Sequence, residues 1–167
     1  PKANFAGQNF ERWISMGAFG TGSLFIDFMA GVGLRYRCVN LRDTFFLENH
    51  QGIIDSVYRC FKHTARQAAQ RWGEKNLPER VQKALENPQR QNEFFDFLHV
   101  VAPRTDYDSG RADARGKPWA SYYLSVPDKM QLAPEGGFTS FPYSIARYVT
   151  APEEVYGRSP AMTALAD

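Results

Sequence analysis

Hydrophobic positions along the chain switch between a helical spacing and runs typical of strands. Over residues 4–19 the apolar side chains Phe10, Trp13, Ile14 and Phe19 recur at helical intervals, which predicts an amphipathic helix with these residues on one face. Apolar runs rich in Phe, Tyr, Val and Leu follow and predict short strands at residues 24–28, 34–39, 44–48 and 53–62. Turn-forming residues separate the last two runs, so we expect a hairpin there.

Two helices are predicted between residues 64 and 87 from the residues that would begin them. Thr64 and Gln67 have the spacing of a capping box, in which each side chain bonds the other residue's backbone amide, so residues 65–72 should form a helix. Pro78 fits the first turn of a second helix that runs to about residue 87. We interpret this second helix as a connecting strut that lies outside the hydrophobic core.

The second half of the chain is mostly extended, with one long polar interruption. Residues 93–102 and 119–126 are dense in strand-forming side chains. Residues 104–117 between them hold charges of both signs and two glycines, which indicates a mobile surface loop. Pro142 interrupts residues 138–148 and restricts them to an edge strand or an irregular piece. The whole pattern predicts an α+β fold with two small sheets separated by a helical segment.

A helix start lies close to the last residue of the sequence. Ser159 is a good N-cap residue, and Pro160 suits the first helical position because its missing amide hydrogen is not needed there. Ala, Met and Leu continue the helix, but only eight residues remain, and so short a helix is marginal in isolation. Since the sequence also begins with Pro1 rather than methionine, we expect it to be an internal part of a longer protein.

Composition fits a folded domain and argues against several functions. An apolar share of 43% over 167 residues is enough for a hydrophobic core. Basic and acidic side chains nearly balance, at a net charge of +2, which is no basis for general binding to polyanions. The sequence holds no apolar run of the about 18 residues needed to cross a bilayer, so we expect no membrane contact. Cys38 and Cys60 fall in strand-like runs, and we interpret them as buried thiols.

No residue pattern points to catalysis, a metal or a cofactor. No two of His50, His63 and His99 lie close in the sequence, and they form no cluster with the spacing of metal ligands. The glycines between residues 17 and 22 follow a helix and precede a strand, the reverse of the order in a phosphate-binding loop, so we interpret them as a flexible turn. We therefore expect a protein that is not an enzyme and that binds no metal or cofactor.

The polar loop and the strand after it supply candidate contacts with a neighbouring subunit or a partner. Basic and acidic side chains nearly cancel in the loop, which favours ion pairing, within a solvated loop or between subunits, over contact with phosphates. Large amphipathic side chains beside them are of a kind enriched at protein interfaces. The candidate contact residues are Arg104, Asp106, Tyr107, Arg111, Arg115, Lys117, Trp119 and Tyr122.

Four segments give the chain a family resemblance. These are Thr44-x-Phe46, residues 52–59 (GIIDSVYR), residues 61–68 (FKHTARQA) and residues 154–161 (EVYGRSPA). Together they resemble the portal, or head-to-tail connecting, proteins of short-tailed bacteriophages, and the resemblance covers nearly the whole chain. It implies a structural protein that forms a ring, usually of twelve subunits, at one capsid vertex of the virion.

The resemblance also implies partners and a place of assembly. Members of this family assemble in the host cytoplasm, with capsid and scaffold proteins around the ring. The terminase motor pumps double-stranded DNA inward through the channel of the ring, and the DNA later leaves through it to tail or head-completion adaptor proteins. Neither a membrane nor a cofactor is part of this scheme.

Mapped onto the family's architecture, the chain would span four parts of a portal subunit. Residues 1–76 would be part of the wing, residues 77–98 the first stem segment, residues 99–150 the clip and residues 151–167 the start of the second stem helix. The family motif at that stem start consists of Tyr156, Gly157, Arg158, Ser159 and Pro160.

One alternative function comes from the most basic part of the chain. The first 76 residues carry a net charge of +4, and basic strand residues there alternate with aromatic ones, a combination suited to single-stranded nucleic acid. The basic residues are Arg35, Arg37, Arg42 and Arg59, beside Tyr36, Phe45 and Tyr58. We take Arg35 and Arg37 as candidate DNA-facing residues, in a portal subunit or in a nucleic-acid-binding module of another protein. An enzyme domain whose site is completed by segments outside this sequence is a third, weaker hypothesis.

Overall fold

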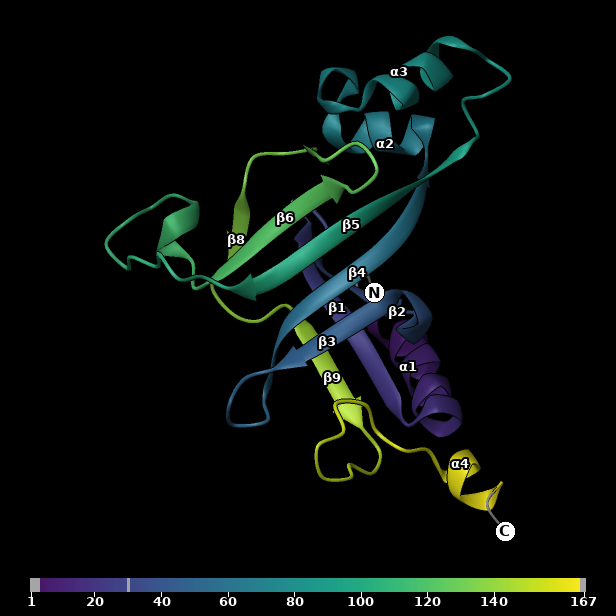
Figure 1. Cartoon of the computed structure of the whole chain (residues 1–167), viewed down its shortest axis with the longest axis vertical. Helices are drawn as coiled ribbons and strands as arrows, with labels where there is room; N and C mark the ends of the chain where they lie inside the picture. The colour runs from purple at the N-terminus through teal and green to yellow at the C-terminus, as the bar shows by residue number, and fades with distance from the viewer. Residues whose placement is uncertain (1–3, 30, 166–167) are drawn as a thin grey trace. The chain divides into compact units, whose positions relative to one another are not determined.

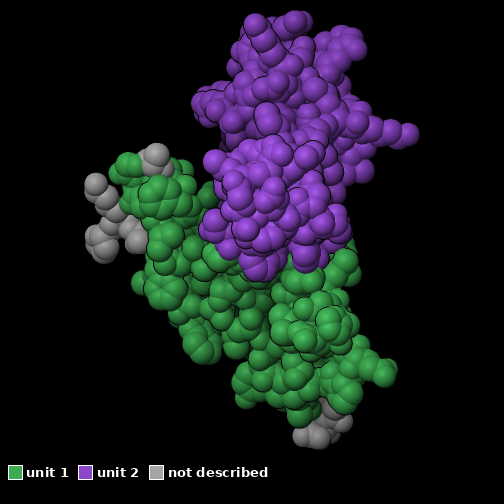
Figure 2. Space-filling model, turned by 90° about the vertical axis from the view of Figure 1, so that its left-hand side faces the viewer, with its two compact units in different colours: residues 1–55, 140–167 green, residues 56–139 purple. Residues whose placement is uncertain are grey.

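A computed structural model describes residues 4–29 and 31–165 of the chain. They divide into two compact units (Figure 2). Unit 1 combines residues 1–55 with residues 140–167, and unit 2 consists of residues 56–139. Both units mix helices with antiparallel strands (Figure 1), so the α+β prediction is confirmed at that level. The unit boundaries do not follow the ranges expected for wing, stem and clip, and those ranges stay predictions.

Unit 1 contains a three-stranded antiparallel sheet in the order β2-β1-β9. In the register of this sheet, Phe25 of the central strand lies opposite Arg37 of β2 and opposite Tyr143 of β9. The elements of this unit are α1 (Phe5–Phe19), β1 (Thr21–Met29), β2 (Gly33–Val39), the 3-10 helix η1 (Leu41–Asp43), β3 (Thr44–Glu48), β9 (Tyr143–Arg147) and α4 (Pro160–Ala164). Leu24, Phe25 and Tyr143 are among its buried side chains.

The apolar face predicted for the first helix is exposed. Phe10, Trp13 and Ile14 do share a face of α1, but each is more than half exposed, and α1 buries none of its residues. Phe19, also exposed, lies on another side of the helix, at the turn into β1. The prediction of a shared face is therefore confirmed for Phe10, Trp13 and Ile14 and wrong for Phe19. Polar side chains such as Asn4 and Gln8 attach α1 to its sheet.

Unit 2 is built on antiparallel strands in the order β4-β5-β6-β7, with β8 paired to β6. Two short helices, α2 and α3, connect β4 to β5 and contact each other (Figure 1). The elements are β4 (Ile54–Thr64), α2 (Ala65–Trp72), η2 (Glu74–Asn76), α3 (Glu79–Glu86), β5 (Phe94–Pro103), η3 (Ala114–Gly116), β6 (Trp119–Ser125), β7 (Met130–Gln131) and β8 (Gly136–Phe138). The helical segment is thus an insertion between two strands of one sheet, and the prediction that it separates two sheets is wrong.

The core of unit 2 lies where these two helices meet β5. Trp72 packs on Phe97 with ring centroids 5.0 Å apart, and Leu77, Val81 and Ala84 from the second helical segment are buried with them. The interpretation of that segment as a strut outside the core is therefore wrong. The apolar side chains on one side of this segment are enough to cover helix α2 and the end of the sheet.

Two further expectations have clear outcomes. Cys38 is half-buried and Cys60 is exposed, so the interpretation as buried thiols is wrong for Cys60. Burial raises the pKa of the Cys38 thiol, to which Glu11 contributes. None of the helices in the described ranges has both the length and the hydropathy to cross a membrane.

The capping box at the start of α2 is present and supports a first prediction. Thr64 Oγ1 accepts the Gln67 amide at 3.2 Å, and Gln67 Oε1 accepts the Thr64 amide at 3.0 Å. Thr64→Ala should lower the free energy of unfolding by about 1 kcal/mol, because a helix amide loses its acceptor. Urea denaturation followed by tryptophan fluorescence, to which Trp72 in the core of unit 2 contributes, measures this. Thr64→Ser, which keeps the hydroxyl, should retain most of the stability. Equal losses for both substitutions would contradict this role of the hydroxyl.

Candidate functional site

Gly157, the second residue of the five-residue family motif at 156–160, makes a close backbone contact with Gly20. A Cβ atom on Gly157 would stand 2.3 Å from the carbonyl oxygen of Gly20, and one on Gly20 would stand 2.2 Å from that of Gly157. The Gly157 amide donates to Thr21 Oγ1 at 2.7 Å, and the Tyr148 amide donates to the Gly20 oxygen at 2.8 Å. Gly20 also has a φ of 76°, which favours glycine. The motif is thereby fixed against the turn between α1 and β1.

Tyr156 attaches the same segment to β3. Its hydroxyl donates to the Thr44 carbonyl oxygen at 3.2 Å and accepts the Phe46 amide at 3.4 Å. The Tyr156 ring packs on Phe46, with centroids 5.5 Å apart, and Phe46 is buried. Thr44 and Phe46, which the resemblance placed in a separate segment, are therefore the residues that bind the motif's tyrosine.

The last three residues of the motif start α4. Ser159 is 1% exposed, and its hydroxyl accepts the Met162 amide at 3.0 Å, while Pro160 is the first helical residue. Arg158 donates its amide to the Val149 oxygen at 2.8 Å and pairs through its guanidinium with Glu154. The predicted N-cap and helix start are confirmed. Residues 166–167 at the end of the expected stem start lie outside the described residues.

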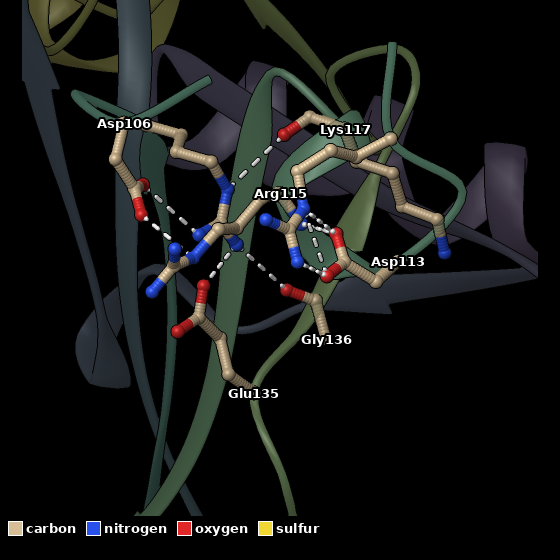
Figure 3. Close-up of polar contacts among 8 residues, drawn as sticks. Asp106, Asp113, Arg115, Lys117, Glu135 and Gly136 are labelled. Carbon is tan, nitrogen blue, oxygen red and sulfur yellow. Dashed lines mark hydrogen bonds and ion pairs between the residues drawn. The ribbon is translucent and has the colours of Figure 1, made fainter. Parts of the chain in front are cut away.

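A second candidate site is centred on Arg104, at the start of the polar loop. Figure 3 labels its partners Asp106, Lys117, Glu135 and Gly136. The Arg104 side chain is 2% exposed and donates to the backbone oxygens of Lys117 at 3.2 Å and Gly136 at 3.3 Å. It also pairs with Asp106 at 3.2 Å and with Glu135. Desolvation disfavours the charged guanidinium, but hydrogen bonds and attraction from the two carboxylates outweigh it and raise the pKa of Arg104.

Other ion pairs cross-link the loop itself. Arg115 pairs with Asp106 at 3.2 Å, and Arg111 makes a two-pronged contact with Asp113. Asp113 also accepts the Arg115 amide at 3.0 Å and so caps η3. These four side chains are half-exposed at the loop surface. The balanced charges of the loop thus meet each other within one chain, which was one of the alternatives that the sequence left open.

The aromatic candidates differ in exposure. Tyr107 is 48% exposed on the loop, whereas Trp119 and Tyr122 lie half-buried on β6. Burial, reinforced by the nearby Glu135 carboxylate, raises the pKa of the Tyr122 hydroxyl. The structure therefore offers Tyr107, together with the outer arginines of the loop, as the accessible group of this site. Sequence reasoning missed Glu135 and Gly136, since nothing in their local sequence points to an arginine thirty residues earlier.

The candidate DNA-facing residues are accessible. Arg35 and Arg37 are exposed and, being two apart on β2, project from the same face of the sheet. Arg59, which the alternative hypothesis grouped with them, is 4% exposed and belongs to unit 2. The basic surface proposed for single-stranded nucleic acid is therefore smaller than the sequence suggested.

The histidines form no metal centre among the described residues, where no three His, Cys, Asp or Glu side chains are grouped as ligands. His99 is fully buried, stacks on Tyr123 with ring centroids 4.3 Å apart, and has its Nε2 atom 3.0 Å from Ser121 Oγ. Burial, with a smaller contribution from the positive charges of Arg59 and Arg71, lowers the pKa of His99 to about 3. This residue is therefore neutral at physiological pH and packs as part of the sheet.

Comparison with known proteins identifies the family of the chain. The portal protein of Salmonella phage epsilon15 is 30% identical to the chain over 155 residues, which are 92% of the chain and 28% of that protein. The probable portal protein of Bordetella phage BPP-1 is 29% identical over 169 residues, covering 99% of the chain and 30% of that protein. The chain thus spans less than a third of either relative. The family of bacteriophage head to tail connecting proteins matches residues 1–167, and the chain belongs to it.

Proposed function

We propose that the chain is part of a structural subunit of a phage portal, a closed ring at one capsid vertex of the virion. The observation that carries this proposal is the family match over residues 1–167, supported by two relatives named as portal proteins. In this role the ring provides the channel for DNA packaging and ejection. The subunit contributes surfaces and a passage to this process, without a catalytic step of its own.

The partners follow from that position. Terminase docks on the ring during packaging, tail or head-completion adaptor proteins dock on it afterwards, and capsid and scaffold proteins surround it during assembly in the host cytoplasm. Double-stranded DNA slides through the channel. A net charge of only +2 suits sliding, because a strongly basic wall would bind each passing phosphate in a salt-dependent way.

We propose distinct tasks for the two candidate sites within such a subunit. The motif at 156–160 holds the start of the second stem helix on the wing, through Gly157 and Tyr156. The polar loop belongs to the clip, where Tyr107, Arg111 and Arg115 contact a neighbouring subunit or an adaptor. Arg104, with its side chain buried, positions the loop for that contact.

The test is the assembly state of the protein at its natural length. Native mass spectrometry and cryo-electron microscopy should show a closed ring of about twelve copies, as head-to-tail contacts with cyclic symmetry require. A protein that stays monomeric at high concentration would overturn the proposal. The loop assignment is tested separately: Tyr107→Ala should weaken either the ring itself or the binding of the adaptor protein to preformed rings, and a variant that changes neither would contradict the assignment.

A second candidate function rests on the two exposed arginines of β2. Because Arg35 and Arg37 lie on the same face of the strand, both positive charges can contact one phosphate backbone. Fluorescence anisotropy with a single-stranded oligonucleotide at low salt should detect binding that Arg35→Ala/Arg37→Ala abolishes. Absence of binding by the unmodified protein under these conditions removes this candidate.

A further inference from the structure

Helix α1 is attached to its own unit by polar side chains. The Asn4 side-chain amide donates to the Tyr36 carbonyl oxygen at 2.8 Å and accepts the Tyr36 amide at 2.9 Å. Gln8 Oε1 accepts the Cys38 amide at 2.6 Å, and the Ser15 hydroxyl donates to the Thr21 oxygen at 2.8 Å. β2 is an edge strand of the sheet of unit 1, so Asn4 and Gln8 occupy backbone groups that would otherwise be open to another strand.

The opposite face of α1 is apolar and uncovered. Phe10, Trp13 and Ile14 are 66%, 61% and 57% exposed, at the spacing that places them on one side of a helix. At these exposures they leave on the order of 300 Å² of apolar surface in contact with water, since a whole aromatic side chain offers about 150–250 Å². A helix normally turns such a face toward its core, and here the polar face has that position.

A second apolar surface of similar size lies on another element of the same unit. Phe45 and Leu47 on β3 are 55% and 50% exposed, and Ile53, after the turn, is 58% exposed. The Asn49 amide donates to the Ile53 oxygen at 2.9 Å, which sets Ile53 opposite Asn49. Side chains alternate along a strand, so Phe45, Leu47 and Ile53 share one face. The other face of β3 carries the buried Thr44 and Phe46.

We propose that the outward face of α1 in one copy of the chain packs on the outward face of β3 in the adjacent copy. This inference rests on the proposed function, since a closed ring needs two different, complementary surfaces on every subunit. The two faces meet that need: both are apolar, they match in area, and a helix packs readily on the face of a strand pair. About 300 Å² is a substantial share of the about 800 Å² that each partner buries in a stable interface.

The inference is tested by Trp13→Ser in the protein at its natural length. Native mass spectrometry should show at least a tenfold fall in the ring population and a folded monomer with an unchanged melting temperature. Phe28→Ser is the matched control, because Phe28 is 71% exposed in the same unit but lies on neither surface. Rings of Trp13→Ser as abundant as those of the unmodified protein would overturn the inference and leave the proposed function intact. Failure of the unmodified protein to form rings would overturn the proposed function itself.

Disulfide cross-linking identifies the surface that α1 contacts. In the natural-length protein with all its cysteines replaced by serine, Cys38 and Cys60 among them, Trp13→Cys combined with Leu47→Cys should give a ladder of linked multimers on a non-reducing gel. Each single substitution should give no ladder. A double variant that runs only as a monomer, whether unlinked or linked within one polypeptide, would overturn the inference, because the face of α1 would then meet something other than the adjacent copy.

Discussion

Gly157→Ala is expected to destabilise unit 1 by about 3 kcal/mol, at the upper end for one added methyl group in a packed interior. The new Cβ atom would lie 2.3 Å from the Gly20 oxygen and 3.0 Å from the Arg147 Cβ atom. Neither neighbour can move cheaply, because the Gly20 oxygen accepts the Tyr148 amide and Arg147 is paired with Thr21 in the sheet. Gly157 itself is held by the bond from its amide to Thr21 Oγ1. Thermal unfolding combined with hydrogen exchange should show earlier exchange in β1 and β9.

Gly17→Ala is the matched control for this substitution. Gly17 lies inside α1, and a Cβ atom there would meet no atom within 4 Å. Alanine should therefore stabilise the helix by about 0.5–1 kcal/mol, because it restricts the unfolded backbone. If Gly157→Ala left hydrogen exchange in β1 and β9 unchanged, the close approach of the two glycine backbones would not be what fixes the motif.

Local signals in the sequence predicted local structure well. The pairing of Thr64 with Gln67, the N-cap at Ser159 and the turn after residue 48 each depend on side chains within a few residues of the backbone that they bond. Residues that are neighbours in the sequence determine these contacts, so the predicted ends of the elements lie close to the observed ones. The contact of Gly157 with Gly20 could not be predicted in this way, because the two residues lie far apart in the sequence. The residues around Gly20 predict only a turn.

The helix α1 shows how much a periodic pattern of apolar residues leaves undetermined. The period of Phe10, Trp13 and Ile14 defines a face of the helix, but period alone does not say what that face meets. Asn4 and Gln8 instead bond backbone groups of the edge strand β2, which places the polar side of the helix against the sheet. If other copies complete the surfaces of this chain, as we propose, burial within one chain is an incomplete guide to which side of a helix faces inward.

The polar loop shows the same limit in its electrostatics. Seven charged residues of mixed sign in residues 104–117 suggest ion pairs, within a solvated loop or between subunits, and the sequence pattern does not distinguish Arg104 from the arginines that follow it. The structure separates them, since Arg104 alone among these arginines has its side chain almost fully buried. Arg104 is buried because strand β8 and Glu135, the residue before it, lie next to its side chain. They bring a carboxylate and the Gly136 oxygen to the guanidinium.

Arg104→Ala is expected to lower the free energy of unfolding of unit 2 by about 2 kcal/mol. The substitution leaves the backbone oxygens of Lys117 and Gly136 without their donor and removes the cation shared by Glu135 and Asp106. A fully buried pair would cost about 3–5 kcal/mol when broken, but Glu135 is 35% and Asp106 is 54% exposed, so water stabilises part of the charge left behind. Hydrogen exchange should increase in β6, in β8 and in the loop.

Arg111→Ala separates this effect from the loss of any loop charge. Arg111 pairs with Asp113 while both side chains are about half exposed, so Arg111→Ala should cost much less stability than Arg104→Ala, because water solvates the charge left behind. Arg104→Lys should fall between the two, because an ammonium group keeps the charge but cannot donate to two carbonyls and two carboxylates in the geometry of the guanidinium. Equal losses for Arg104→Ala and Arg111→Ala would mean that the buried guanidinium does not hold the loop. The clip contact proposed for Tyr107 would then have no rigid support, since Arg104 joins the start of the loop to its last residue and to β8.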